Sequence, residues 1–289
     1  MHRLLNWVAR FFRFIANRFE RISNNYALHI DSVKRGIARY DMFASPDEAY
    51  YAQEYLHWIK PLILKDYPER TARVLDLGCG QGRLSIPISF FCKEVTAVDF
   101  TPEVINLAKQ YSIKHGCNNV SFVLSDILPY IKKIDKPYAD VILLIEVTFV
   151  LPSYKETLKE IFRILKPGGT LFAAFRSQYF NILHSVRNKK WEDARKVITQ
   201  NEGYLWGDNT WLSWQTENGI ISLLEEIGYN QVNCAGIGVC SGIKGDPLTA
   251  VVWPSLLTKD EQKELLDIEI KIAETYANCG RYILAIAKK

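Results

Sequence analysis

The chain has 289 residues, of which 48% are hydrophobic, enough to bury the core of one α/β domain with additions or of two small domains. Its formal net charge of +4 comes without a long run of Lys or Arg, so the composition does not require nucleic acid as a partner. No stretch reaches the roughly 18 apolar residues of a membrane span, and the six cysteines show neither a C-x-x-C pair nor a metal-binding spacing, which suits the reduced thiols of a cytoplasmic protein.

Residues 3–22 predict an amphipathic basic helix. Apolar residues recur on one helical face and arginines lie mostly on the other: Leu4, Val8, Phe11, Phe12, Ile15, Phe19 and Ile22 against Arg3, Arg10, Arg13 and Arg21. The ordinary role of such a face is packing on the core or across a homodimer contact. A peripheral contact with a membrane surface or a substrate carrier is a second interpretation, and an organelle presequence is a third.

A second helix is expected to follow the sequence Ser45-Pro46-Asp47-Glu48, which has the pattern of a capping box with proline at the first helical position. Its apolar spacing continues to about Lys60, where Pro61 should kink or end the helix. We therefore expect residues 1–70 to form an N-terminal helical extension.

The stretch V-L-D-L-G-C-G-Q-G-R-L-S at residues 74–85 predicts a buried strand, over 73–77, that runs into a glycine-rich turn and a helix. Glycines at 78, 80 and 82 let a ligand approach the backbone, and the helix directs free N–H groups toward it. A nicotinamide fingerprint would place its third glycine at position 83, which is Arg. The pattern therefore argues against NAD or FAD.

Strands and helices then alternate, which is typical of a parallel sheet with right-handed crossovers. The predicted strand 94–99 ends in Asp99, 21 residues beyond Gly78, where a nucleotide-binding unit carries its ribose-binding acid. Strand 120–124 is followed by Asp126 and Ile127. Strand 139–145 leads to Glu146 at the sheet edge where open α/β sheets bind ligands.

The rest of the chain continues this alternation with two insertions, 177–214 and 240–280. A capping box at 153–156 is expected to start a helix that ends in L-K-P-G-G at 165–169 before a fifth strand. A helix over 216–227, a strand near 231–238 and a last strand over 282–287 follow. The second insertion has its own capping box at 258–261 and a helix to about residue 277.

Four of these features, in their order and spacing, resemble the class I S-adenosylmethionine (SAM) dependent methyltransferases: D-x-G-x-G-x-G at 76–82, the acid at 99, the acid with an apolar neighbour at 126–127, and L-K-P-G-G. The resemblance implies an α/β fold over residues 71–289, with a Rossmann-like seven-stranded, mostly parallel sheet and helices on both faces. The last strand would be antiparallel. The extension and the insertions would add a helical and aromatic cap.

The same resemblance implies the cofactor, S-adenosyl-L-methionine, with S-adenosyl-L-homocysteine as product. The glycine turn would hold the methionine part, Asp99 the ribose hydroxyls, and Asp126 with Ile127 the adenine. The expected cofactor-binding residues are Asp76, Gly78, Cys79, Gly80, Gly82, Asp99, Phe100, Asp126, Ile127 and Glu146.

The methyl acceptor is expected to lie under the insertion 177–214 and the N-terminal extension, which in this family commonly folds over the cofactor. Candidate substrate-binding residues are Tyr40, Phe43, Tyr179, Trp206, Trp211 and Trp214. The alternative for most of these rings is a small satellite core that fastens the insertion. His184 and Glu146 are the candidate catalytic residues, His184 as a general base, with packing as the alternative role of the histidine.

Methyl transfer from a sulfonium needs alignment more than acid–base machinery, so the core does not name the acceptor, and N- and O-methylation of a small molecule are both open. Quinone-pathway methyltransferases carry a Glu-His pair after strand four, whereas Val147-Thr148-Phe149-Val150 follows Glu146 here. We therefore expect no metal, and activity that survives EDTA.

Two alternatives to a small-molecule enzyme stay open. One is methylation of a saccharide or lipid-linked intermediate, which the basic helix would suit. The other is a SAM-binding regulator without transfer activity. A nucleic-acid methyltransferase is disfavoured, because the Asn/Asp-Pro-Pro-aromatic motif of DNA amino-methylating enzymes is missing after strand four.

Overall fold

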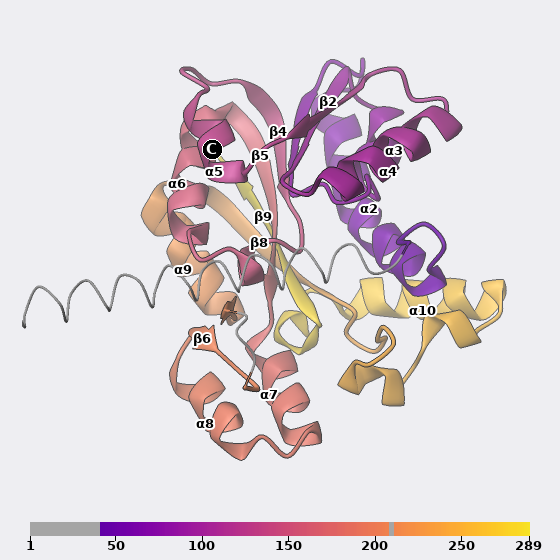
Figure 1. Cartoon of the computed structure of the whole chain (residues 1–289), viewed down its shortest axis with the longest axis vertical. Coiled ribbons are helices and arrows are strands. Elements are labelled where there is room, and N and C mark those ends of the chain that lie inside the picture. The colour runs from indigo at the N-terminus through magenta and orange to yellow at the C-terminus, as the bar shows by residue number, and fades with distance from the viewer. Residues whose placement is uncertain (1–40, 208–210) are drawn as a thin grey trace, which may run out of the picture.

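The computed structural model describes residues 41–207 and 211–289, so the predicted helix 3–22 and Tyr40 lie outside the described residues. A seven-stranded sheet in the order β3-β2-β1-β4-β5-β9-β8 runs through the molecule (Figure 1). Its strands are β1 (Arg73–Leu77), β2 (Glu94–Asp99), β3 (Val120–Leu124), β4 (Ala139–Leu144), β5 (Leu165–Arg176), β8 (Asn230–Ile237) and β9 (Tyr282–Lys288). Strands β1 to β5 pair in parallel and β9 is antiparallel to both of its neighbours. The predicted Rossmann-like sheet is confirmed.

Helices cover both faces of this sheet because its strands are apolar on both sides. Within β1, Val74 belongs to one buried core and Leu75 and Leu77 to the other. On the first face pack α2 (Pro46–Asp66), α3 (Ser85–Ser89), α4 (Pro102–Lys114) and α10 (Lys259–Ile272), and on the second α5 (Ile127–Lys132), α6 (Tyr154–Ile164) and α9 (Glu217–Ile227) (Figure 1).

One edge of the sheet gathers the polar residues that follow the strands. The carboxyl ends of the five parallel strands meet there, and the start of antiparallel β9 joins them, since Arg176 at the end of β5 is in register with Tyr282. The glycine turn, Asp99, Glu146 and Arg176 therefore share this edge. It is the edge where open α/β sheets bind their ligands.

Two expectations about helix α2 are wrong. The helix runs on to Asp66 with Pro61 inside it, and Tyr67 N–H still closes the last turn on Ile63. Its capping box is only half made: Ser45 accepts a bond from the N–H of Glu48, but the Glu48 carboxylate binds Arg83 instead of returning to Ser45. A tertiary ion pair has replaced the local bond.

The capping box expected at 153–156 is also wrong, because Ser153 makes no side-chain cap and Glu156 pairs with Lys132 of α5 at 2.5 Å. The third, at Thr258 and Glu261, is confirmed with both reciprocal bonds. Helix α10, which it starts, ends at Ile272, short of the expected 277.

The insertion after β5 contains helices α7 (Gln178–Arg187) and α8 (Trp191–Thr199) and a small hairpin, β6 (Glu202–Tyr204) and β7 (Trp211–Ser213). It closes on its own satellite core of Val197, Leu205, Leu212 and Trp214. The second insertion packs against α2 through α10 and the turn at 254–256. Within the described residues, no helix is both long enough and apolar enough to cross a membrane.

Candidate functional site

The glycine turn after β1 has a backbone that only glycine tolerates well. Gly78, Gly80 and Gly82 have φ values of 79°, 53° and 85°. The N–H groups of Gly78 and Cys79 donate to the carbonyl of Val98, which holds the turn against β2 at 2.8 and 3.0 Å. A Cβ on Gly78 would lie 2.3 Å from Cγ2 of Val147, whereas one on Gly80 would meet only Met42 Sδ, at 3.7 Å. The turn is thus tight toward β4 and open above Gly80.

Asp99 joins this turn to the end of β2. Its carboxylate accepts hydrogen bonds from the N–H groups of Gly80, at 3.1 Å, and Thr101, at 2.9 Å. Burial raises the pKa of Asp99, although these backbone bonds oppose the shift. An ionised carboxylate has about four acceptor positions, so two backbone bonds leave capacity for a pair of ribose hydroxyls. This geometry fits a nucleoside held beside the glycine turn.

The residues expected around an adenine lie at the next strand end. Asp126 is exposed at the start of α5, and the neighbouring Ile127 is buried under it. Phe100 is half-buried directly after Asp99. The fold therefore brings the predicted cofactor-binding residues from β1, β2 and β3 to one edge, and their set of glycines, acids and apolar neighbours fits S-adenosylmethionine.

Asp76 lies buried one residue before the end of β1 and accepts a hydrogen bond from the hydroxyl of Ser85. Burial raises its pKa from 3.8 to about 6, with a further contribution from Asp99, while the Ser85 bond opposes the shift. A proton is therefore held more tightly by Asp76 in the folded chain than in the unfolded chain.

This shift predicts a pH dependence of stability. The stability that the protonated Asp76 carboxyl adds to the fold is fully present below about pH 3.8. It is lost as the pH rises through about 6, because the ionised form is disfavoured in the fold. As the pH rises from 4 to 7, the unfolding free energy of the wild type should therefore fall by roughly 2 to 3 kcal/mol relative to that of Asp76→Asn. Urea unfolding of both proteins across this range checks it, and parallel pH profiles would contradict the shift.

The start of the described chain lies over the glycine turn. Met42 N–H donates to Oε1 of Gln81 at 2.8 Å. Phe43 stacks on Tyr111 of α4, with ring centroids 4.1 Å apart, and Tyr111 in turn donates to Asp41. The structure thus places Phe43 on the α4 side of the turn, away from the insertion 177–214.

Arg83 links the glycine turn to two other elements. Its guanidinium donates to Glu48 of α2 and, at 2.9 Å, to Glu146 after β4. Burial would raise the pKa of Glu146, but Arg83 and Arg281 outweigh it and hold that pKa below its ordinary value. Glu146 also has a φ of 58°, in the left-handed region. It is an ionised carboxylate fixed at the centre of the sheet edge.

The aromatic residues of the insertion differ in how far they are buried. Trp214 is completely buried in the satellite core, and its Nε1 donates to the carbonyls of Val197 and Gln200, a geometry that favours packing. Trp211 lies near Tyr154, with ring centroids 6.3 Å apart, and Tyr179 is 44% exposed. Trp206 donates to Ser185.

The ring of His184 lies against that of Trp206, with centroids 4.3 Å apart and the ring planes tilted by 41°. Burial lowers the pKa of this imidazole, and Arg176 lowers it further. His184 is therefore neutral near pH 7 and lies within electrostatic reach of the sheet edge.

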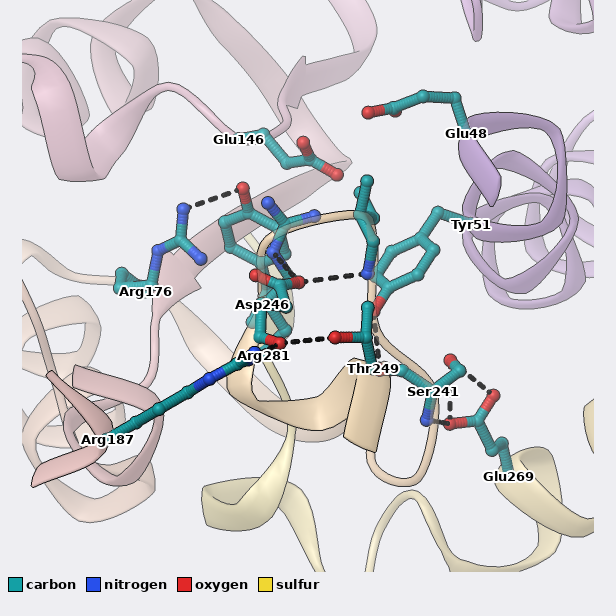
Figure 2. A network of polar contacts seen from close by, with 12 residues as sticks. Glu48, Tyr51, Glu146, Arg176, Arg187, Ser241, Asp246, Thr249, Glu269 and Arg281 are labelled. Carbon is teal, nitrogen blue, oxygen red and sulfur yellow. Dashed lines mark hydrogen bonds and ion pairs between the residues drawn. The ribbon is translucent and has the colours of Figure 1, made fainter. Parts of the chain in front are cut away.

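Sequence reasoning missed a group of buried charges at this edge (Figure 2). Arg176 ends β5 and Arg281 precedes β9, and both guanidinium groups lie near the ring of Tyr282, at 4.3 and 5.2 Å. Asp246 pairs with Arg281 at 3.0 Å. The position of Arg176 at the carboxyl end of a parallel strand was the available signal. Within residues 41–207 and 211–289, no group of three or more His, Cys, Asp or Glu side chains is arranged to hold a metal ion.

Comparison with known proteins gives a consistent result. A family model described as a methyltransferase domain matches residues 68–219. The ubiquinone biosynthesis O-methyltransferase of Xylella fastidiosa (strain 9a5c) is 29% identical over 168 residues, which cover 55% of this chain and 64% of that protein. That of Proteus mirabilis is 27% identical over 170 residues, 54% of this chain and 69% of that protein. The chain thus spans slightly less than two thirds of the first of these relatives.

Two solved structures share the fold. The N-methyltransferase NodS from Bradyrhizobium japonicum WM9, in complex with S-adenosyl-L-homocysteine, has a TM-score of 0.53 at 15% identity and covers 89% of this chain and 97% of its own. A SAM-dependent methyltransferase from Methanosarcina mazei has a TM-score of 0.51 at 17% identity, covering 78% and 96%.

Proposed function

Because the chain belongs to the S-adenosylmethionine-dependent methyltransferases, we propose that it transfers a methyl group from S-adenosylmethionine to a nitrogen or oxygen of a small-molecule acceptor. The observation that carries the proposal is the bond between Asp99 and the Gly80 N–H, which places a carboxylate beside an open glycine turn. The O-methyltransferase relatives add weak support for oxygen as the accepting atom.

The residues of this chain have distinct parts in the proposed reaction. S-adenosylmethionine, when bound, supplies an electrophilic methyl group for an in-line displacement. Asp99 and the glycine turn hold the cofactor, and Met42, whose N–H donates to Gln81, lies beside Gly80. Glu146 is engaged with Arg83 and has a lowered pKa, so positioning suits it better than proton transfer. His184, neutral near pH 7, is the better proton acceptor.

The cofactor assignment predicts that Asp99→Ala weakens S-adenosylhomocysteine binding by about a hundredfold or more, because charge-assisted hydrogen bonds to the ribose are lost. Isothermal titration calorimetry measures the affinity. Asp126→Ala, at an exposed position, is the milder companion variant. Thermal unfolding of each variant shows that the fold is intact, and an unchanged affinity in a folded Asp99→Ala protein would refute the assignment.

The proton acceptor is tested by His184→Ala. We expect turnover to fall by roughly a hundredfold while S-adenosylhomocysteine binding is unchanged, since the imidazole lies in the insertion and not at the glycine turn. The assay is methyl transfer to a panel of amines, phenols and glycans. Unchanged turnover would remove His184 from the reaction, and a wild-type protein that binds the cofactor but methylates nothing in the panel would favour a SAM-binding regulator.

A further inference from the structure

Within the part of the chain that the structure describes, Arg176 is a buried cation without a carboxylate partner. The residue is 9% exposed, and no Asp or Glu oxygen of the described residues lies within 4.0 Å of its guanidinium. Nη2 donates to the hydroxyl of Tyr282 at 3.0 Å, whereas Nη1 has no hydrogen-bond partner in residues 41–207 and 211–289. Three aromatic rings surround the group, those of Phe149, Phe180 and Tyr282, at 4.3 to 4.6 Å from its central carbon. A buried, unpaired charge of this kind is costly to the fold.

The acids nearest to Arg176 are bound to other arginines. Glu146 and Asp246 both act on Arg176 electrostatically. Glu146, however, receives a hydrogen bond from Arg83, and Asp246 forms its ion pair with Arg281. Glu54, also buried at this edge, has a pKa raised well above its ordinary value by burial and by Glu269. Because Arg83 takes two carboxylates and Arg281 takes the third, this pairing leaves Arg176 without an ion-pair partner among the described residues.

Further donors point to the same region. Nη1 of Arg281 is also buried and finds no hydrogen-bond partner among the described residues. Burial raises the pKa of Tyr282 to about 12, so its hydroxyl keeps a proton while it accepts from Arg176. Figure 2 shows the side chains of Glu146, Arg176 and Arg281 converging between α2 and the strands β5 and β9. The two guanidinium groups therefore offer donors to this region.

We propose that Arg176, assisted by Arg281, binds a carboxylate group of the methyl acceptor. This inference rests on the proposed function and names the class of its substrate. Two unpaired nitrogens, one on each guanidinium, match the two oxygens of a carboxylate. The three arginines are already matched in number by Glu48, Glu146 and Asp246, so each further negative charge is costly in this buried region, and a carboxylate monoanion is favoured over a phosphate dianion. The neighbouring rings suit an acceptor with an apolar or aromatic body.

The position of Arg176 and Arg281 relative to the glycine turn suits such an acceptor. Strands β1, β4 and β5 are consecutive neighbours in the sheet. The end of β5 is displaced from the end of β1 by two strand spacings, about 10 Å, and by three residues along the strand, about 10 Å more, which places the two ends about 14 Å apart. A small molecule anchored at Arg176 could extend its nucleophile toward the cofactor turn, past Glu146 at the end of β4.

The test uses benzoate as the probe and the full chain, with and without saturating S-adenosylhomocysteine. We expect benzoate to bind the wild type, benzamide to bind at least about tenfold more weakly, and Arg176→Met and Arg281→Met to lose about tenfold to a hundredfold in benzoate affinity. Arg73→Met, at the opposite end of β1 in a half-exposed ion pair, is the control and should bind benzoate as the wild type does.

Stability separates a binding role from a structural one. Arg176→Met should unfold at the same temperature as the wild type or higher, because it removes an unpaired buried charge. Four results would each overturn the proposal: a loss of stability in this variant, equal affinity of the wild type for benzoate and benzamide, stronger binding of inorganic phosphate than of benzoate, or no benzoate binding to the wild type. S-adenosylhomocysteine affinity, measured on the same proteins, should be unchanged by Arg176→Met. Failure of the wild type to bind that nucleoside would instead reject the proposed function.

Discussion

Replacing Arg83 with Met should lower the free energy of unfolding by about 3 to 5 kcal/mol, the usual cost of removing one partner from a buried ion pair. Methionine has a similar length but no charge. Glu48, 2% exposed, and Glu146, 15% exposed, would each lose the ion pair that Arg83 now forms with them. The energy lost is the desolvation of these acids, which Arg83 now offsets. Urea unfolding at pH 7 measures it.

A matched control is Arg73→Met. Arg73 pairs with Glu94, but the two side chains are 33% and 39% exposed, so water screens the interaction. We expect a loss of less than about 1 kcal/mol there. Adding Glu146→Gln to the Arg83→Met protein should recover part of the stability, because one uncompensated charge is removed. Equal losses in the two arginine variants would contradict the buried ion-pair account.

The second large effect is expected for Trp214→Ala, which should cost about 3 to 5 kcal/mol because a fully buried indole is removed. The carbonyl of Gln200 would also lose its side-chain donor, whereas that of Val197 keeps a hydrogen bond from Gln178. Since Val197, Leu205 and Leu212 form the satellite core with this ring, the loss should be concentrated in the insertion 177–214. Hydrogen exchange measured for each segment should be faster in α7 and α8 of the variant than in the same helices of the wild type, with little change in the sheet.

Trp191→Ala provides the control within the same insertion. Trp191 is 53% exposed at the start of α8, so its removal should change stability by no more than about 0.5 kcal/mol. If both tryptophan variants behaved alike, Trp214 would not be the centre of the satellite core.

The parts of the fold that could be predicted from the sequence depend on local pattern. The strand, glycine turn and helix at 73–89 follow from apolar periodicity and from glycines that occupy left-handed backbone. The capping box at Thr258 was predictable for the same reason, since both of its bonds connect residues three apart. At Ser45 and Ser153 the same pattern failed, because Glu48 and Glu156 bind arginine and lysine from distant elements.

The arginine pair could not be predicted in this way. Arg176 and Arg281 become neighbours only because β9 returns antiparallel beside β5, and no short-range spacing encodes that register. The tryptophans of the insertion show the same limit. The sequence shows that four tryptophans lie close together in the chain, at positions 191, 206, 211 and 214. Which of these rings becomes part of the core is decided by the packing of α7, α8 and the hairpin.

The contacts of helix α2 limit where segments can be exchanged between related methyltransferases. The family match begins at residue 68, after α2 has ended. Yet α2 supplies Glu48 to Arg83, Tyr50 donates to Glu269 of α10, and Tyr51 donates to the carbonyl of Ser241. A chimera with its crossover at residue 68 would part these buried polar groups from their partners. A recombination point that keeps the contacts intact lies before Ser45, so α2 must be inherited together with the glycine turn and the second insertion.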